Sequence, residues 1–414
     1  MTAPADAPAG RLETLEVTVL DREGRPAPGV EVEVEQLRHR VGFGCTVFDL
    51  EDLAPDAEGR SLWLDLFDQA TLPFYWRRFE PAPGGPTDAA RLRELLEILR
   101  AQGVRTKGHP LVWHTLAPQW LRGRPTDEVE EAIAHRVARE VRDFAGLIDQ
   151  WDVVNESVIL PDFTAEDNAI TALARARGRL HVIRRAVDTA READPSVRLV
   201  LNDFDLTVAF EEVIEEVLEA GVRIDAIGLQ THMHKGFRGE EQIAEVLERF
   251  SRFGLPLQLT ETTLLSGDLM PAHIGDLNDY VVQDWPSTPE GEERQAEEIV
   301  RHYRTALSHP ALESVTCWGL HDARSWLGAP GGLVRADGTA KPAYHALRRL
   351  LREQWWVPRM TLRTDAHGAV ALQGLAGDYR VAVDGFSRDL SLAPGGTVTT
   401  LRASPGASGS PAGR

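Results

Sequence analysis

The sequence predicts an α/β protein: a (β/α)8 barrel, the TIM-barrel fold, with a small antiparallel β-sandwich built from the two ends of the chain. Three observations predict it. Short apolar strands alternate with longer helical runs through the middle of the chain, this alternation occurs eight times, and both chain ends alternate apolar and polar residues between Gly-rich turns. Strand–helix alternation implies a parallel sheet, and eight such units close into a barrel. A doubly wound open sheet is the alternative, and the strand count favours the barrel.

Both chain ends carry strand signals. Residues 14–35 alternate apolar and polar side chains around a turn at Gly24 and Pro26, and residues 358–402 contain further short strands between Gly-rich turns. Two strands alone are not stable in water, so we expect the two ends to form one sandwich. The predicted organisation is a sandwich at 11–38 and 356–402, a barrel at 39–355, and disordered small polar segments at 1–10 and 403–414.

The barrel strands are predicted from short apolar runs that end in polar residues. We expect them at 40–47, 66–72, 104–113, 148–156, 197–205, 224–234, 255–262 and 314–320. The runs between them place apolar residues at i, i+3 and i+4 and end at helix-stop residues, which indicates helices. These lie at 88–103, 127–146, 178–194, 210–221, 241–254 and 290–309.

Composition excludes several classes of partner. The net charge of −19 would repel phosphate, so neither nucleic acid nor an anionic membrane surface is expected to bind. The sequence contains no run of about eighteen apolar residues, so it predicts no membrane-spanning helix. The N-terminus has no basic start followed by an apolar stretch, so we expect a cytoplasmic protein unless a secretory leader has been removed. Cys45 and Cys317 lie in apolar strands and are interpreted as buried thiols. The sequence leaves the oligomeric state open.

Polar and aromatic residues gather where the predicted strands end. The active site of a (β/α)8 barrel lies at the C-terminal ends of its strands, so these residues should converge. They are His109, Trp113 and His114; Asn155 and Glu156; Asn202 and Asp203; Gln230 and His232; Glu261; and Trp318, His321, Asp322 and Trp326.

Two of these residues, Glu156 and Glu261, are carboxylates among apolar neighbours on strands that face each other across the mouth. Such a pair is the apparatus for cleaving a glycosidic bond, in which one group protonates the leaving oxygen and the other attacks the anomeric carbon. A metal site is the competing interpretation. Four histidines near the mouth suggest it, namely His109, His114, His232 and His234, but no element carries them at clean ligand spacing.

The residues resemble glycoside hydrolase family 10, which contains the endo-β-1,4-xylanases. The resemblance covers roughly residues 40–352. It is carried, in order, by "KGHPLVWH" (107–114), "WDVVNE" (151–156), "LNDF" (201–204), "GLQTHMH" (228–234), "LTET" (259–262), "CWGLHDARSWL" (317–327) and "KPAYHAL" (341–347). The chain ends resemble the carboxypeptidase-regulatory-like β-sandwich, split here by the barrel. The family resemblance implies a retaining β-glycosidase that acts on xylo-oligosaccharides or related β-glycosides in polysaccharide degradation, without a cofactor.

The resemblance also implies roles for individual residues. Glu156 corresponds to the general acid/base and Glu261 to the nucleophile. Around them, Asn155 would hold the sugar 2-hydroxyl, and His232, with Gln230 beside it, would bond to the nucleophile. The walls of the sugar site would be formed by His109, Trp113, Trp318, Trp326 and, by a looser match, Trp76. The charge of Glu261 would raise the pKa of Glu156, and retention requires carboxyl groups roughly 5–5.5 Å apart.

Two stretches depart from the family pattern. Where the family usually carries Glu, Asn and Lys that grip sugar hydroxyls, this chain reads "TLPFYW" (71–76), and where an Asp usually orients the histidine it has Thr263. Phe74 and Tyr75 would suit a different sugar or an apolar portion of a substrate. The alternative function is therefore a β-glycosidase of plant natural-product glycosides, of the saponin type with an apolar aglycone. A non-catalytic glycan-binding protein is a further alternative, which the presence of both carboxylates disfavours.

Overall fold

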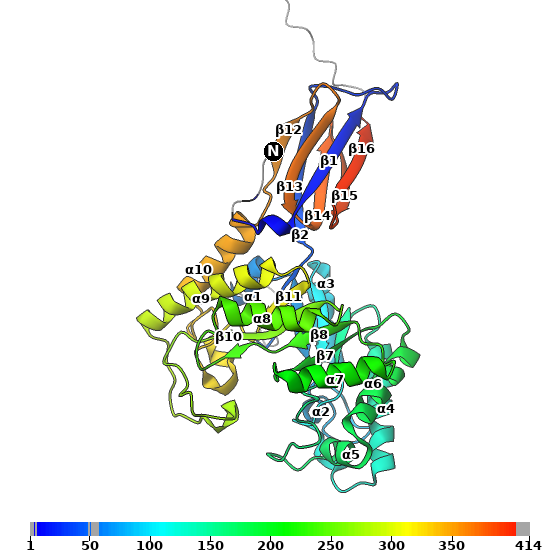
Figure 1. The fold of residues 1–414 in the computed structure, drawn as a ribbon, viewed down its shortest axis with the longest axis vertical. Coiled ribbons are helices and arrows are strands. Elements are labelled where there is room, and N and C mark those ends of the chain that lie inside the picture. Colours follow the sequence, from blue (N-terminus) through cyan, green and yellow to red (C-terminus); the bar gives the residue numbers. More distant parts are fainter. Residues whose placement is uncertain (1–3, 5, 49, 51–57, 403–414) are drawn as a thin grey trace, which may run out of the picture. The chain divides into compact units, whose positions relative to one another are not determined.

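The computed structural model describes residues 4, 6–48, 50 and 58–402. Its contacts divide the chain into two compact units, one formed by residues 1–41 with 345–414 and the other by residues 42–344. The first unit therefore combines both ends of the chain, and the second contains the strand–helix repeats (Figure 1). The tail at 403–414, for which disorder is expected, lies outside the described residues, as do residues 1–3 and 5; Ala9–Arg11 forms a short 3-10 helix.

The second unit is an eight-stranded parallel β-barrel. Its hydrogen-bonded order is β11-β3-β4-β5-β6-β7-β8-β10, and the pairing of β10 with β11 closes the ring. A two-residue strand, β9 (His232–Met233), pairs with the end of β10. The barrel strands are β3 (Gly42–Thr46), β4 (Gln69–Pro73), β5 (Arg105–His109), β6 (Gln150–Asn155), β7 (Arg198–Asp203), β8 (Ala226–Leu229), β10 (Leu257–Leu264) and β11 (Leu312–Cys317). The (β/α)8 prediction is confirmed.

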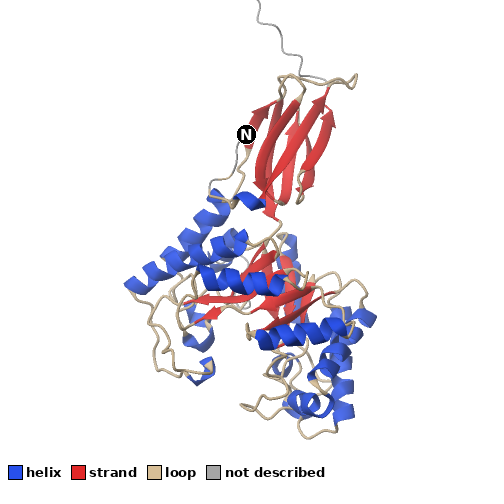
Figure 2. Cartoon of the chain, in the orientation of Figure 1, coloured by secondary structure: helices blue, strands red, loops and turns tan. Residues whose placement is uncertain are grey.

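Helices connect the strands and cover the barrel (Figure 2). In α3, Leu92, Leu95, Leu96 and Leu99 are buried at a spacing of three and four residues, which is the apolar stripe that seats a helix on a sheet. The α-helices of this unit are α1 (Glu58–Leu66), α2 (Trp76–Phe79), α3 (Ala89–Ala101), α4 (Thr126–Asp143), α5 (Ala169–Arg177), α6 (Arg179–Ala193), α7 (Val208–Glu219), α8 (Glu240–Ser251) and α9 (Pro289–Ser308). Short 3-10 helices lie at Gln119–Leu121, Leu277–Asp279, Asp322–Arg324 and Trp326–Gly328.

Local sequence explains several helix starts. The side chains of Asn168, Thr207 and Thr288 accept hydrogen bonds from backbone N–H groups in the first turns of α5, α7 and α9. Those N–H groups have no partner within the helix, so a polar cap stabilises the start. Pro289 at the first position of α9 adds a residue whose φ is already helical.

Strand β5 comes unusually close to the side chain of the next strand. A Cβ on Gly108 would lie 2.2 Å from the ring of Trp151, so only glycine permits this contact. Trp151 packs in turn on Phe74, with ring centroids 4.6 Å apart, and Phe74 packs on Phe144. Phe74 is fully buried. The prediction that it lines a substrate site is therefore wrong, because its ring belongs to the barrel's packing.

The first unit is the predicted sandwich of the two chain ends. One sheet has the order β13-β1-β16 and the other β12-β2-β14-β15, so strands from both ends share each sheet. The strands are β1 (Leu12–Leu20), β2 (Glu31–His39), β12 (Met360–Arg363), β13 (Ala369–Leu375), β14 (Gly377–Val383), β15 (Phe386–Leu392) and β16 (Thr397–Arg402). Alternate residues, such as Leu15, Val17 and Val19, point into one core. The pairing of β1 with β16 is parallel, whereas an all-antiparallel sandwich is expected from the sequence.

The chain between barrel and sandwich carries α10 (Pro342–Arg349) and a π-helical turn at Leu350–Gln354. No helix in the described part of the chain is both long and apolar enough to cross a membrane.

Candidate active site

Glu156 and Glu261 are joined through two amide side chains at the C-terminal ends of the barrel strands. Asn202 Nδ2 donates to Glu261 Oε1 over 2.8 Å and to Asn155 Oδ1 over 2.7 Å. Asn155 Nδ2 in turn donates to Glu156 Oε1 over 3.2 Å. The hydroxyl of Thr260 donates to Asn202 Oδ1 over 2.6 Å, while the carboxylate of Glu261, which accepts, faces the amide nitrogen. The two carboxylates therefore belong to one hydrogen-bonded site.

Glu156 lies in a conformation that is unusual for a residue with a side chain. Its φ is +58°, in the left-handed region, and its backbone N–H donates to Asn202 O over 2.8 Å. The carboxyl group accepts hydrogen bonds from Trp113 Nε1 over 2.8 Å and from Gln230 Nε2 over 3.4 Å, and His114 Nε2 lies 3.4 Å from Oε2. Backbone strain of this kind costs about 1–3 kcal/mol and is kept where the surroundings enforce it.

Burial is the main reason that Glu156 differs from an ordinary carboxyl group. Burial, helped by the charges of Glu261 and Asp203 and opposed by the hydrogen bond from Trp113, raises the pKa of Glu156 to about 8. The sequence-based expectation named the charge of Glu261 as the cause, and desolvation is the larger one. At neutral pH Glu156 therefore holds a proton that it can donate.

Glu261 has a different environment. Oε1 accepts from Asn202, and Oε2 lies 3.1 Å from His232 Nε2. The other imidazole nitrogen, Nδ1, lies 2.9 Å from the hydroxyl of Thr263. Both oxygens of Glu261 thus have hydrogen-bond partners that suit an ionised, acceptor-only carboxylate. The site therefore combines a buried carboxyl group of raised pKa, Glu156, with a second carboxyl group that has a hydrogen-bond partner on each oxygen, Glu261.

Aromatic side chains line the part of the mouth above β3, β4, β5 and β11. We call the set Phe48, Tyr75, His109, Trp113 and Trp318 the aromatic wall. Tyr75 contacts three of the others, with centroid distances of 6.4 Å to Phe48, 5.8 Å to His109 and 5.8 Å to Trp113. Trp318 lies 5.8 Å from Phe48 and 5.2 Å from His109. Flat apolar faces of this kind are suited to stacking against a substrate.

The buried ion pair of Asp152 and Lys107 holds the imidazole of His109 in the aromatic wall. Its Nδ1 lies 2.8 Å from Asp152 Oδ2, and Lys107 Nζ lies 2.7 Å from Asp152 Oδ1. All three side chains are almost fully buried. The neighbouring cation and the hydrogen bond to His109 hold the pKa of Asp152 below its usual value, against the opposing effect of burial. Asp152 therefore stays ionised and orients the imidazole of His109.

The structure places three more sequence-predicted residues, of which Trp76 lies elsewhere than expected. Gln230 donates to Asn155 Oδ1 over 3.2 Å and to Glu156 Oε1 over 3.4 Å. Trp76 is buried and does not join the aromatic wall: its indole donates to Glu80 over 3.0 Å and its ring stacks under Arg136. Trp326 contacts the nucleophile's partner, with its ring centroid 4.9 Å from that of His232.

Sequence reasoning assigned no role to Asn202, Asp152 or Phe48. Register could have indicated Asn202, because it pairs with Asn155 in the parallel β6–β7 ladder and so points at the same place. Strict alternation would put Asp152 and Asn155 on opposite faces of β6, but the register shift between Asp152 and Val154 puts both on the same face, and the barrel's closure brings Asp152 to Lys107 and His109. Phe48 follows β3 in a loop, where periodicity gives no signal.

The four mouth histidines do not converge. His109 bonds to Asp152, and His232 to Glu261 and Thr263. Burial lowers the pKa of His114 to about 4 and that of His234 to about 3. No group of three or more His, Cys, Asp or Glu side chains within the described residues is arranged to hold a metal ion.

Comparison with known proteins identifies the family. The sequence profile of glycosyl hydrolase family 10 matches residues 76–350. This chain belongs to glycosyl hydrolase family 10. The family 10 chain is 30% identical over 270 residues to endo-1,4-beta-xylanase B of Thermotoga neapolitana, which covers 60% of this chain and 69% of the xylanase. It is 25% identical to a solved family 10 structure from Paenibacillus barcinonensis, with a TM-score of 0.63 over 75% of this chain and 94% of that one.

A longer relative matches beyond the barrel. The chain is 25% identical over 383 residues, 90% of its length, to anti-sigma-I factor RsgI6 of Acetivibrio thermocellus, and spans 45% of that protein. The family membership makes the chain a glycoside hydrolase, in a family of retaining glycosidases. The predicted resemblance to glycoside hydrolase family 10 is confirmed.

Proposed function

We propose that this family 10 protein hydrolyses β-glycosides with retention of configuration, using Glu156 as acid/base and Glu261 as nucleophile. The observation that carries the proposal is the contrast between the two carboxyl groups. Burial raises the pKa of Glu156 to about 8, so it holds a proton near neutral pH, whereas Glu261 accepts from Asn202 and lies 3.1 Å from an imidazole nitrogen of His232. Environments that separate two carboxyl groups in this way distinguish the acid from the nucleophile.

The first step forms a glycosyl-enzyme ester. A Glu261 oxygen bonds to the anomeric carbon, the glycosidic C–O bond breaks, and the Glu156 proton passes to the leaving oxygen. The bond to Glu261 removes a negative charge that raises the pKa of Glu156. Glu156, now ionised, becomes a better base.

The second step hydrolyses the ester. Glu156 takes a proton from water, the water oxygen bonds to the anomeric carbon, and the bond to Glu261 breaks. The donors of Asn202 and His232 then receive the charge that returns to Glu261. Both carboxyl groups finish the cycle in their starting states, so no external cofactor takes part in these bond changes. The carboxyl separation of roughly 5–5.5 Å that retention requires stays a prediction.

Xylo-oligosaccharides and related β-glycosides are the first substrate candidates. The relatives named xylanase support this class, since the catalytic pair and its amides occur here on the same fold. Trp113 and His109 in the aromatic wall offer stacking faces for a sugar ring beside Glu156.

A glycoside with an apolar aglycone is the second candidate, and exposed apolar side chains favour it. Within the described barrel, the large apolar side chains with high exposure all follow β7 or β10, at the mouth. They are Phe204 (45% exposed), Val208 (61%), Leu269 (38%), Val281 (86%) and Val282 (40%). Exposed apolar groups near a site can mark a binding surface, and these residues follow strands whose C-terminal ends form the mouth.

Product analysis tests the proposal. The protein is incubated with xylotriose, an aryl β-xyloside, an aryl β-glucoside and a steroidal β-glycoside, and the anomer released first is read by proton NMR. Retention requires the β-anomer; first release of the α-anomer, or no turnover of any glycoside, would overturn the mechanism. Rapid cleavage of xylotriose with none of the steroidal glycoside would remove the second candidate.

The role of each carboxylate has its own test. Glu261→Ala should be inactive and regain activity with azide, which replaces the nucleophile and gives a glycosyl azide of inverted configuration. Glu156→Ala should retain activity only on substrates with a good leaving group, such as dinitrophenyl glycosides. Unchanged turnover in Glu261→Ala would show that Glu261 is not the nucleophile.

A further inference from the structure

Thr263 contacts His232, the partner of Glu261, on one side and Gly331, in the loop after β11, on the other. It lies in β10, two residues after Glu261, and pairs in register with His232 of β9. Its hydroxyl lies 2.9 Å from His232 Nδ1, while His232 Nε2 lies 3.1 Å from Glu261 Oε2. The three side chains form a line of hydrogen bonds in which Thr263 is almost fully buried.

The donors and acceptors in this line fix a tautomer. An ionised Glu261 can only accept, so His232 Nε2 must carry the hydrogen. A neutral imidazole then presents Nδ1 as an acceptor, and the Thr263 hydroxyl can donate to it. A carboxylate at position 263 could only accept, and would therefore require hydrogen on both nitrogens and a positive charge on the ring.

The surroundings of His232 suit the neutral ring. Glu261 and His234 are titratable side chains that contact it, and the ring centroid of His234 is 5.7 Å away. Burial lowers the pKa of His234 to about 3, so that neighbour is neutral near pH 7. Trp318 and Trp326 cover the remaining ring faces, at centroid distances of 6.0 and 4.9 Å.

We propose that Thr263 is a positioning residue that holds His232 as the neutral tautomer whose Nε2–H is donated to the nucleophile Glu261. The proposal rests on the proposed function, because it assigns Glu261 the nucleophile's role. Positive charge develops on the sugar in the transition state while Glu261 loses its charge. A neutral donor stabilises the carboxylate between turnovers without placing a cation beside the developing one.

The methyl group of Thr263 is held as well. It packs against Gly331, where an added Cβ would lie only 2.7 Å from Thr263 Cγ2. Both neighbours of Gly331 are anchored: Pro330 O accepts from Ser266 N over 2.9 Å, and Gly332 O accepts from Lys341 Nζ over 2.9 Å.

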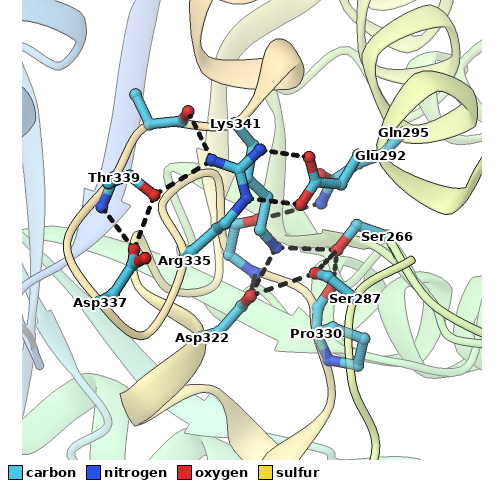
Figure 3. Close-up of polar contacts among 12 residues, drawn as sticks. Ser266, Ser287, Glu292, Gln295, Asp322, Pro330, Arg335, Asp337, Thr339 and Lys341 are labelled. Carbon is cyan, nitrogen blue, oxygen red and sulfur yellow. Dashed lines mark hydrogen bonds and ion pairs between the residues drawn. The ribbon is translucent and has the colours of Figure 1, made fainter. Parts of the chain in front are cut away.

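A buried network fixes this segment, and Figure 3 shows its members converging on the Lys341 ammonium. Lys341 Nζ also lies 2.8 Å from Ser266 Oγ and 2.7 Å from Asp322 Oδ2, and Asp322 Oδ1 accepts from Gly332 N over 2.9 Å. Ser266 follows β10 and Asp322 follows β11. The network therefore joins the strand that carries Glu261 and Thr263 to the loop that carries Trp326, and Gly331 bears on Thr263 from that loop.

The test uses three substitutions that separate hydroxyl, methyl and charge. Thr263→Ser keeps the hydroxyl and should retain kcat within about 3-fold. Thr263→Val keeps the shape but has no hydroxyl, so His232 loses its orientation and kcat should fall at least about 10-fold, with KM within about 3-fold. Thr263→Asp requires an imidazolium, which should move the acid limb of the kcat/KM profile at least about 1 unit lower, because a cation beside Glu261 favours its ionised form.

A paired substitution tests the contact with the loop. Gly331→Ala should displace the Thr263 methyl and lower kcat as Thr263→Val does. Thr263→Ser removes the methyl that the new Cβ meets, so the double variant Gly331→Ala/Thr263→Ser should recover most of the lost rate. Such a rescue is expected if Gly331→Ala acts by displacing the Thr263 hydroxyl. It is not expected if Gly331→Ala damages the fold in general.

All rates are measured with a dinitrophenyl β-glycoside that the wild-type protein hydrolyses, so that a failure of the proposed function appears first, as an inactive wild type. Circular dichroism and thermal melting exclude unfolded variants. A Thr263→Val protein with wild-type kcat and pH profile would overturn the proposal. So would a Thr263→Ser protein as impaired as Thr263→Val, since the methyl packing rather than the hydroxyl would then be what matters.

Discussion

Trp113 donates its indole N–H to Glu156 over 2.8 Å, and this hydrogen bond works against the burial that keeps Glu156 protonated. Trp113 therefore offers a stacking face in the aromatic wall and also lowers the pKa of Glu156. The net pKa of Glu156, about 8, is the outcome of both effects. This relationship gives the first prediction.

We expect kcat/KM to fall as the pH rises through about 8, because the proposed mechanism needs the protonated form of Glu156. Trp113→Phe removes a hydrogen bond that favours the ionised form, so the basic limb should move to higher pH. Trp318→Phe alters the same wall without touching this bond and should leave the limb in place. A basic limb that moves to lower pH in Trp113→Phe would contradict the assignment. The measurement is the pH dependence of kcat/KM on an aryl β-glycoside.

Asn202 should matter to catalysis as much as the residues to which the family resemblance assigns roles. Asn202→Ala removes the donor to Glu261 and the donor to Asn155 together. A donor aimed at a charge that changes during reaction is worth about 10²-fold in kcat, so a loss of that size is expected. The measurement is kcat on the same aryl β-glycoside, with thermal melting as the check on folding.

Gly228 provides an independent route to the same site. A Cβ at Gly228 would lie 2.4 Å from Asn202 Oδ1, so Gly228→Ala should displace the amide and reproduce the loss of kcat. Gly10 belongs to the first unit and an added Cβ there meets nothing within 4 Å, so Gly10→Ala serves as the matched control. Full activity in both Asn202→Ala and Gly228→Ala would exclude a role for this amide.

The barrel was predictable because its signals are repeated and local. Apolar strands and amphipathic helices such as α3 recur along the chain, and each strand end carries its polar residue in the sequence itself. Glu156 and Glu261 follow from the same logic, since parallel strands bring their C-terminal ends together. The sandwich was predictable from alternation, but the parallel β1–β16 pairing was not, because alternation does not encode strand direction.

The details of the site were harder to predict because they depend on three-dimensional closure. Tyr75 and Phe74 are adjacent and equally apolar in sequence, yet Tyr75 joins the aromatic wall and Phe74 packs in the core. Which one faces the mouth depends on how the chain turns after β4. The cause of the raised Glu156 pKa was also beyond the sequence, since burial is a property of the folded site.

Removing either partner of the Lys341–Asp322 pair alone should strongly lower the stability of the barrel. Lys341 is fully buried, and burial lowers the pKa of its ammonium and raises the pKa of Asp322. Removing one member of a buried pair strands the other and costs about 3–5 kcal/mol of unfolding free energy. Lys341→Met and Asp322→Asn should each show a loss of this order in urea unfolding.

The double variant distinguishes a coupled pair from two separate contributions. Lys341→Met/Asp322→Asn leaves no isolated buried charge, so its loss should be smaller than the sum of the single losses. Strictly additive losses would show that the two groups do not stabilise each other. Arg301 and Glu240, an exposed pair on α9 and α8, give the control, since breaking it should change stability by at most about 1 kcal/mol.

A buried histidine should make the barrel sensitive to acid. His302 in α9 has no exposed surface and lies 3.3 Å from the Thr262 hydroxyl; burial, with the charge of Arg238, lowers its pKa from 6.5 to about 3. Between pH 6.5 and about 3 the unfolded chain binds a proton here that the folded chain does not, so stability is lost as the pH falls through this window. The loss amounts to about 2 kcal/mol at pH 5.

His302→Gln cannot titrate and should be less sensitive by that amount when urea unfolding, followed by tryptophan fluorescence, is compared at pH 7.5 and pH 5. His135→Gln, on the exposed face of α4, should keep the wild-type dependence. An unchanged difference between the two pH values in His302→Gln would mean that the acid sensitivity arises elsewhere.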